Sequence, residues 1–285
     1  MEYNSYKFLY QTKQQFAFFL ASDIHLMSDK FDRARFIADM ENAKGEGARV
    51  YFNGDIFDMI LPSDMKRYSR ASSKHNVDAI INTAVAEAVE LLAPYADIID
   101  IIGLGNHDTA PIKYHHVDAV LWLINELNRH RSDKTKKRFG NIRHGGYSGF
   151  VRLSFELASG GHAKVFDIYY NHGQGGAAEV TKGSIDLNRR QYISADLIWL
   201  GHKHTKKLDY LDAEIGVDHT GRIYERKKLG VITGCYLKAS EQYDINKEGY
   251  RLNFSEEHMR TPQATGGVLL YISVSRDLLE SRVLI

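Results

Sequence analysis

The stretch 97–109 joins a short apolar run to three side chains that commonly bind metals. The run from 97 to 103 is rich in isoleucine and stops at glycine, which is typical of a buried strand that ends abruptly. Asn106, His107 and Asp108 follow directly. We therefore expect these three residues in a loop at the carboxyl end of a strand. That edge of an α/β sheet is where ligands usually bind.

The chain repeats this arrangement four more times. In each case an apolar run of predicted strand residues leads into aspartate, asparagine or histidine. The runs and their clusters are 16–22 with Asp23 and His25, 48–52 with Asn53 and Asp55, 164–170 with Asn171 and His172, and 196–200 with His202 and His204. Clusters with one ligand chemistry at successive strand ends indicate a shared site.

The first half of the chain alternates strands with helices. Apolar residues recur at helical spacing over 34–43, between the first two predicted strands. A strand-helix-strand unit makes its two strands parallel. Further helical stripes cover 77–92 and 117–127, whereas residues 1–15 show no clear period and receive no element.

The second half is richer in strand patterns. Residues 151–157 alternate apolar and polar side chains, as a strand with one solvated face does. We expect further strands around 208–215, 222–233 and 267–275. These elements fit an α/β fold in which two mixed sheets pack face to face with helices outside. We expect a single domain, 1–285, with a motif-bearing core at 16–205 and sheet-closing strands at 206–285.

Composition narrows the class of protein. Lys plus Arg (37) nearly cancels Asp plus Glu (36), so the chain has no overall basic footprint for nucleic acid. The single cysteine, Cys235, fits a reducing compartment. No apolar stretch approaches the length of a membrane span, and the run 16–21 is too short for a signal-peptide core. We expect a cytoplasmic protein without a membrane partner.

The clusters together supply carboxylate, amide and imidazole ligands. The seven candidate ligands are Asp23, His25, Asp55, Asn106, His172, His202 and His204. Mixed imidazole and carboxylate donors suit manganese, our first choice, or iron, zinc, nickel or cobalt better than magnesium or calcium. Seven ligands are too many for one tetrahedral site and about right for two divalent transition-metal ions.

A pair of divalent ions is suited to the hydrolysis of phosphoesters. We therefore expect an enzyme, a metal-dependent phosphoesterase. A hydroxide that bridges the ions would attack the phosphorus, and the ions would neutralise the phosphate oxygens. We expect His107 to assist the leaving group and Asp108 to orient its ring, so both are candidate catalytic residues. Asn53, Asp58 and Gly173 lie beside predicted ligands and are candidate substrate-binding residues. The plain alternative for Gly173 is a flexible turn.

The ordered motifs resemble those of the calcineurin-like metallophosphoesterase superfamily. They are Asp23-x-His25, Gly54-Asp55, Gly105-Asn106-His107-Asp108, His172 and Gly201-His202-x-His204. The resemblance implies a four-layer αββα sandwich with His107 as the catalytic histidine. It also implies one ion held by Asp23, His25, Asp55 and His204, and a second held by Asp55, Asn106, His172 and His202.

The branch within that superfamily is less defined. Its protein serine/threonine phosphatases carry Arg-Gly after the second motif and Glu at the end of the third, where this chain has Met59 and Asp108. Residues 54–58 with Pro62 and Ser63 are similar to the double-strand-break repair nucleases. The segment after His204 looks more like sheet closure than their DNA-capping domain, so a compact phage or bacterial phosphoesterase describes the chain equally well.

Two further features leave alternatives open. The segment 129–138 holds six Lys/Arg against one Asp. It is either a solvated helix end and loop or a phosphate-backbone contact beside the active site. The second interpretation favours a phosphodiester in DNA, RNA or a nucleotide as substrate. His115 and His116, at the expected start of a helix, are exposed polar residues or substrate contacts.

The alternative functions are a phosphomonoesterase and a catalytically silent binding module that keeps the fold. A lone histidine or aspartate at any one of these positions would more often be structural, because polar residues satisfy loops and caps. The metal-site interpretation depends on the seven acting together.

Overall fold

The computed structural model describes residues 1–58, 79–161, 163–175, 181–218, 220–238 and 264–285. Within this part of the chain, the strands form two mixed sheets of six strands each. Sheet A has the order β1 (Glu2–Tyr10), β6 (Ser148–Leu157), β7 (Lys164–Asn171), β8 (Leu197–Leu200), β10 (Ile223–Ile232) and β9 (Lys207–Val217). Sheet B has the order β12 (Leu279–Leu284), β11 (Val268–Val274), β2 (Gln14–Ala21), β3 (Arg49–Phe52), β4 (Ile99–Ile102) and β5 (Arg143–His144).

The two sheets pack face to face around one apolar interior. Phe18 and Leu20 from sheet B are fully buried there, as are Tyr170 and Trp199 from sheet A. Tyr169, the neighbour of Tyr170 in β7, is buried in a separate apolar cluster with Leu187 of the segment 184–188. The predicted parallel pairing of the first two strands of the motif-bearing core, β2 and β3, is confirmed.

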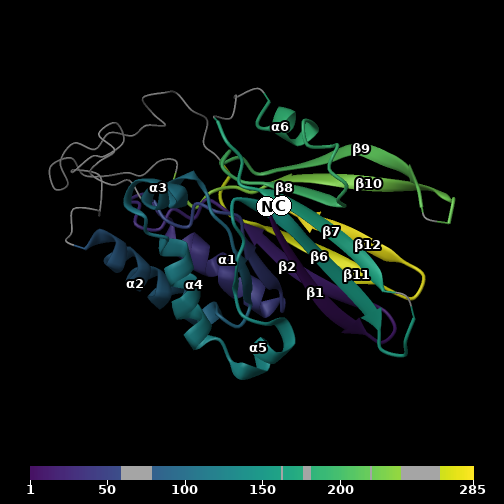
Figure 1. Ribbon diagram of the computed structural model, residues 1–285, viewed down its shortest axis with the longest axis horizontal. Helices are drawn as coiled ribbons and strands as arrows, with labels where there is room; N and C mark the ends of the chain where they lie inside the picture. The colour runs from purple at the N-terminus through teal and green to yellow at the C-terminus, as the bar shows by residue number, and fades with distance from the viewer. Residues whose placement is uncertain (59–78, 162, 176–180, 219, 239–263) are drawn as a thin grey trace.

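Helices cover the two outer faces unequally (Figure 1). The described helices are α1 (Arg33–Gly45), α2 (Ile80–Leu92), α3 (Asn106–His115), α4 (Ala119–His130), α5 (Asp133–Phe139) and α6 (Ser184–Asn188), with a 3-10 turn at Ala93–Tyr95. Helices α1, α2 and α4 bury their apolar faces on sheet B. On sheet A, Leu187 of the short α6 packs over residues of β8 and β10. The predicted αββα layers are therefore present, with the second helical layer reduced to α6 among the described residues.

The first ten residues are a strand, which the sequence analysis did not predict. In β1 the side chains of Tyr6, Phe8 and Tyr10 are buried, and Lys7 and Leu9 between them are exposed. The period of two was hidden because tyrosine serves as the core residue and leucine lies on the solvated face. β1 pairs in parallel with β6 and forms an edge of sheet A.

The third motif begins a helix, so its predicted loop conformation is wrong. Gly105 is the N-cap of α3, and Asn106 is its first residue. His115 ends α3 and His116 is its C-cap, so neither starts a helix as predicted. The helix lacks a clear apolar stripe, since only Asp108 and Pro111 are buried, and periodicity could not reveal it.

The basic segment 129–138 lies at the opposite end of β4 from the third motif. Arg131 donates to the carbonyl oxygen of Ala96 at 3.0 Å and to Asp100 Oδ1 at 2.7 Å. Ala96 precedes β4, whereas Asn106 follows it. In Figure 1, α5 accordingly lies at the bottom of the view, away from α3. A phosphate contact beside the active site is therefore the wrong interpretation of this segment.

Sheet B also contains a strand that the sequence did not predict: β12, which pairs with β11. Pro62 and Ser63, part of the resemblance to repair nucleases, lie outside the described residues. Among the helices that are described, none combines the length and apolarity needed to cross a lipid bilayer.

Candidate metal centre

The five predicted clusters meet at one edge of the sandwich. Three follow β2, β3 and β4 of sheet B, and two follow β7 and β8 of sheet A. Backbone hydrogen bonds join the loops: Asp23 N donates to Gly54 O at 3.0 Å, and Gly201 N donates to His172 O at 3.2 Å. Loops separated by long stretches of sequence are thus held in direct contact.

Asp23, His25 and His204 form a first group whose potential ligand atoms all lie within 4.8 Å of one another. His204 Nε2 is 3.3 Å from Asp23 Oδ1 and 3.1 Å from His25 Nε2. Asp23 and His25 are buried. Asp23 is further fixed by the backbone N–H of His202, which lies 2.9 Å from Oδ2.

Asp55, His172 and His202 form a second group that meets the same distance criterion. His172 Nε2 lies 3.1 Å from Asp55 Oδ2. The other ring nitrogen, Nδ1, is 2.7 Å from the carbonyl oxygen of Asn53. A carbonyl can only accept, so Nδ1 carries the proton in this contact and Nε2 is directed to the carboxylate.

Asp55 also joins His25 and His107 in a third group, which bridges the first two. The backbone N–H of His107 donates to Asp55 Oδ1 at 2.9 Å, so α3 starts against this carboxylate. Asn106 precedes His107, and its Oδ1 atom is buried with no hydrogen-bond partner among the described residues. A buried amide oxygen without a partner is destabilising unless a ligand satisfies it.

The backbone is strained at most of the candidate ligands. Positive φ angles occur at Asp23 (55°), His25 (53°), Asp55 (50°), His202 (66°) and His204 (52°). For residues with a Cβ atom this left-handed region costs roughly 1–2 kcal/mol each. Such strain persists where the surrounding structure over-determines it, and it concentrates at functional sites.

Close packing explains two glycines of the motifs. A Cβ atom on Gly105 would overlap the carboxylate of Asp55. A Cβ atom on Gly201 would lie 2.7 Å from Ser22 Oγ and 3.1 Å from Asp23 Oδ2. Glycine therefore lets the neighbouring backbone approach the two carboxylates.

The charges of the site raise the pKa of His172 and lower the pKa of Asp55. Burial opposes protonation of His172, but the carboxylate of Asp55 outweighs burial and raises the pKa of His172 to about 9. Burial would raise the pKa of Asp55, but His172 and the neighbouring histidines hold that pKa well below its usual range. In the metal-free site His172 thus holds a second proton, which would have to leave when a cation binds.

Asp58, predicted as a substrate contact, instead faces His107. Its Oδ1 atom lies 3.0 Å from His107 Nδ1 and 3.6 Å from His25 Nδ1. Burial would raise the pKa of Asp58, but the two nearby imidazoles, His107 and then His25, hold that pKa well below its usual range. Asp58 is therefore placed to fix the orientation of the His107 ring.

The carboxylate of Asp108, which was predicted to orient the His107 ring, contacts backbone N–H groups instead. Its carboxylate accepts the backbone N–H groups of Gly105 (2.9 Å), Phe57 (3.1 Å) and Ile56 (3.2 Å). Burial, followed by the charge of Asp55, raises the pKa of Asp108 to about 7. Asp108 thus ties the start of α3 to the second motif and is a structural residue of the site, which corrects its predicted catalytic role.

The other predicted substrate contacts also serve the neighbouring ligands. Asn53 is fully buried; its Nδ2 atom donates to Asn171 O at 3.0 Å, and its own carbonyl receives His172. Gly173, with a φ of 99°, directs its carbonyl oxygen to the Tyr147 hydroxyl at 2.5 Å. Both residues therefore position the loop that bears His172.

Sequence reasoning missed the residues that support the site. The ring of Tyr147 lies 5.6 Å from that of His172, centroid to centroid. On the other side of the site, Ser22 Oγ donates to Asp23 and lies 2.6 Å from Thr233 Oγ1, which accepts from Trp199 Nε1 at 3.1 Å. Of these supporting residues, Ser22 alone stands next to a predicted ligand in the sequence. Its position could have indicated a supporting role, whereas nothing in the sequence pointed to the others.

The donor set fits a pair of transition-metal ions. Metal–nitrogen bonds of about 2.0–2.1 Å that meet at a right angle place two nitrogens roughly 3 Å apart. The His25 and His204 Nε2 atoms, 3.1 Å apart, have that spacing. The two groups of the structure also follow the partition implied by the resemblance, with Asp55 in contact with both. Metal binding by these residues stays a prediction.

Three solved structures are distantly similar to this chain. No protein-family profile and no curated protein match the chain. A predicted phosphoesterase of Streptococcus pneumoniae is 12% identical, with 95% of this chain and 90% of that chain covered and a TM-score of 0.34. A metallophosphoesterase of Sphaerobacter thermophilus is also 12% identical, with 94% and 88% covered and a TM-score of 0.31. The GAP50 anchor in the inner membrane complex of Plasmodium is 8% identical, with 94% and 84% covered and a TM-score of 0.39. Likenesses this distant carry no argument about activity.

Proposed function

We propose that the chain is a metal-dependent phosphoester hydrolase of the calcineurin-like metallophosphoesterase superfamily. The observation that carries the proposal is the meeting of two histidine–aspartate groups around Asp55. The buried, unpartnered Asn106 Oδ1 and the strained backbone of the ligand loops support it. Strained backbone is concentrated at functional sites, and a buried polar atom without a partner calls for an explanation such as a bound ion.

Asp23, His25 and His204 would hold one ion, His172, His202 and Asn106 the other, and Asp55 both. Divalent ions in such a site supply Lewis-acid charge for phosphate oxygens and a water of lowered pKa as the nucleophile. Manganese stays our first choice of metal, on the chemistry of the donors.

The chain itself supplies the proton for the leaving group. With Nδ1 of His107 held by Asp58 at 3.0 Å, the Nε2 atom of the ring would pass a proton to the leaving oxygen. His107 follows Asn106 and binds Asp55 through its backbone N–H, so its ring stays beside the ligand groups. Its side chain is 16% exposed, which leaves it accessible to a substrate.

We propose a phosphodiester ahead of a phosphomonoester as substrate, and a nucleic acid strand or nucleotide as the natural target. The position of the basic segment removes one argument for this choice. The similarity of residues 54–58 to repair nucleases is the support that stays. The expected cytoplasmic location also stays a prediction.

Hydrolysis of two aryl esters tests the proposal. The protein is dialysed against EDTA and then assayed with bis(p-nitrophenyl) phosphate and p-nitrophenyl phosphate, with and without added Mn²⁺. We expect hydrolysis only with metal, and faster with the diester. Activity that persists after complete metal removal would contradict the metal-dependent mechanism.

The same assay separates the alternatives. Metal-dependent hydrolysis of the monoester alone would indicate a phosphomonoesterase. Stoichiometric Mn²⁺ binding without hydrolysis of either ester, or of DNA, RNA and cyclic nucleotides, would favour the silent binding module.

A further inference from the structure

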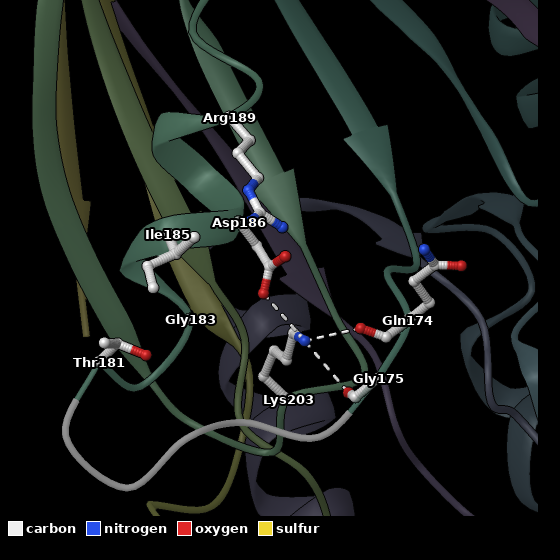
Figure 2. A pocket seen from close by; sticks show the side chains of 8 residues that line it. All are labelled: Gln174, Gly175, Thr181, Gly183, Ile185, Asp186, Arg189 and Lys203. Atoms are coloured by element: carbon white, nitrogen blue, oxygen red, sulfur yellow. Dashed lines mark hydrogen bonds and ion pairs between the residues drawn. The ribbon is translucent and has the colours of Figure 1, made fainter.

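Lys203 is a buried lysine between two candidate ligands, His202 and His204. Only 5% of its surface is exposed. Its side chain enters a cavity of about 570 Å³ between α6 and the segment that follows β7 (Figure 2). The sequence analysis gave this residue no role.

Among the described residues, the ammonium group of Lys203 contacts three oxygens from two other segments (Figure 2). It donates to the carbonyl oxygens of Gln174 at 2.7 Å and Gly175 at 3.1 Å. It also forms an ion pair with Asp186 Oδ2 at 2.9 Å. Gln174 and Gly175 follow His172, and Asp186 belongs to α6.

These contacts are strong constraints because the charge is buried. A desolvated ammonium group is costly unless acceptors satisfy its three donors and an opposite charge lies close. The stem of Lys203 is also packed, since a Cβ atom on Gly183 would lie 3.5 Å from Lys203 Cγ. The loop of Lys203 therefore cannot move independently of the loop that follows His172.

The need for such a constraint is visible in the backbone. His202 and His204, on either side of Lys203, both have positive φ angles, 66° and 52°. A strained turn keeps its shape only if the surrounding structure fixes it. The Gln174, Gly175 and Asp186 oxygens around Lys203 provide such fixed points for the turn.

We propose that Lys203 is a positioning residue for the candidate metal centre. It holds the loop of His202 and His204 in register with the loop of His172, and it ties both to α6. This inference rests on the proposed function, because it requires that these histidines bind metal. Lys203 itself binds neither metal nor substrate.

Manganese binding to the full chain tests the role directly. The Lys203→Met variant keeps the length of the side chain but loses the three donors. We expect its Kd for Mn²⁺ to rise by about 10–100-fold, the usual effect of removing a group that orients metal ligands. We also expect hydrolysis of the aryl diester to recover at saturating Mn²⁺, which a general loss of folding would not allow.

Three further variants serve as controls. Lys207→Met removes a neighbouring lysine that contacts Ser184 of α6 and Asp209. It should leave Mn²⁺ affinity unchanged. Asp186→Asn keeps the lysine and its two carbonyl partners, and should weaken Mn²⁺ binding less than Lys203→Met. In Lys203→Met, Asp186 loses its lysine and keeps an ion pair with Arg190 at 3.9 Å. The double variant Lys203→Met/Asp186→Asn removes that carboxylate, so it should regain stability without regaining Mn²⁺ affinity.

The outcomes separate the two proposals. Wild-type affinity and stoichiometry in the Lys203→Met protein would overturn the positioning role and leave the metal centre intact. A wild-type protein that binds no Mn²⁺ would overturn both. If Lys203→Met does not fold, the folded double variant decides by the same measurement: unchanged affinity there overturns the role, and weakened affinity supports it.

Discussion

The two ends of β4 each carry a buried cluster of charges, and the two clusters differ in the cations that face their carboxylates. At the start of the strand, Asp100 faces the guanidinium groups of Arg49 and Arg131. Beyond the end of the strand, Asp23 and Asp55 face imidazoles, chiefly His204 and His172. Asp100, Asp23 and Asp55 are all buried, whereas His204 keeps 26% of its side chain exposed.

The two clusters differ in whether their cations can release a proton. Arginine keeps its proton at all working pH values and offers no lone pair, so the Asp100 cluster is closed to a metal ion. Imidazole can give up its proton and then ligate a metal. The backbone agrees, because Asp23 and Asp55 have positive φ angles while Arg49, Asp100 and Arg131 do not. We therefore assign the arginine cluster to the stability of the fold and keep the imidazole cluster as the candidate metal centre.

The largest expected effect concerns catalysis at the imidazole end. His107→Ala should lower kcat for the aryl diester by about 10²–10⁴-fold, because the leaving oxygen loses its proton donor. The metal content of the purified protein should stay at the wild-type value. Asp58→Asn, the matched control, keeps the imidazole but weakens its orientation and should have a smaller effect. A fully active His107→Ala protein would remove the catalytic distinction between the two clusters.

The arginine end should respond in stability instead. Arg131→Met leaves the buried Asp100 with one guanidinium partner and should lower the free energy of unfolding by about 3–5 kcal/mol. Urea denaturation of the metal-free protein measures this change. Mn²⁺ affinity of the folded fraction should stay unchanged. Weakened Mn²⁺ binding in that fraction would show that the two ends of β4 are coupled. It would contradict the assignment of the arginine cluster to stability alone.

For Asn106 we expect the opposite of the Arg131 result: little change in stability and a clear loss of Mn²⁺ affinity. The Oδ1 atom of Asn106 makes no hydrogen bond in the described part of the chain. Asn106→Ala should therefore change the metal-free stability by less than about 1 kcal/mol. It should raise the Kd for Mn²⁺ by at least roughly tenfold, the lower end of the effect known for groups that support metal ligands. A strongly destabilised but normally metal-binding variant would assign Asn106 to the fold.

The smallest effect is expected for the exposed basic helix. Lys134 and Lys137 of α5 lie at the arginine end, away from the candidate metal centre. Exposed charges more than about 10 Å away are largely screened at 0.1 M salt. Lys134→Glu/Lys137→Glu should thus leave diester hydrolysis within about twofold of wild type at that salt concentration. A large loss confined to DNA or RNA substrates would restore this segment as a substrate contact.

The sequence predicted which residues meet at the candidate metal centre better than it predicted the helices and supporting residues around it. Strand-end clusters such as Asp23 with His25 could be placed because the strands that lead into them run parallel within each sheet, β2, β3 and β4 in one and β7 and β8 in the other. The helix that starts at Asn106 could not, because its few buried residues give no apolar period. Arg131 was likewise counted with exposed cations, since nothing in a basic run shows which member turns inward to meet Asp100.

The sequence alone determined which chemical groups this protein possesses and which strand end delivers each of them. Hydrophobic period and glycine position are local properties, so they can be read without knowing what packs against what. Tertiary structure decided the partners: Asp58 rather than Asp108 meets His107, and Lys203 reaches back to the loop of His172. Those pairings join residues distant in sequence, and only the packing of two sheets and their loops brings them within hydrogen-bond distance.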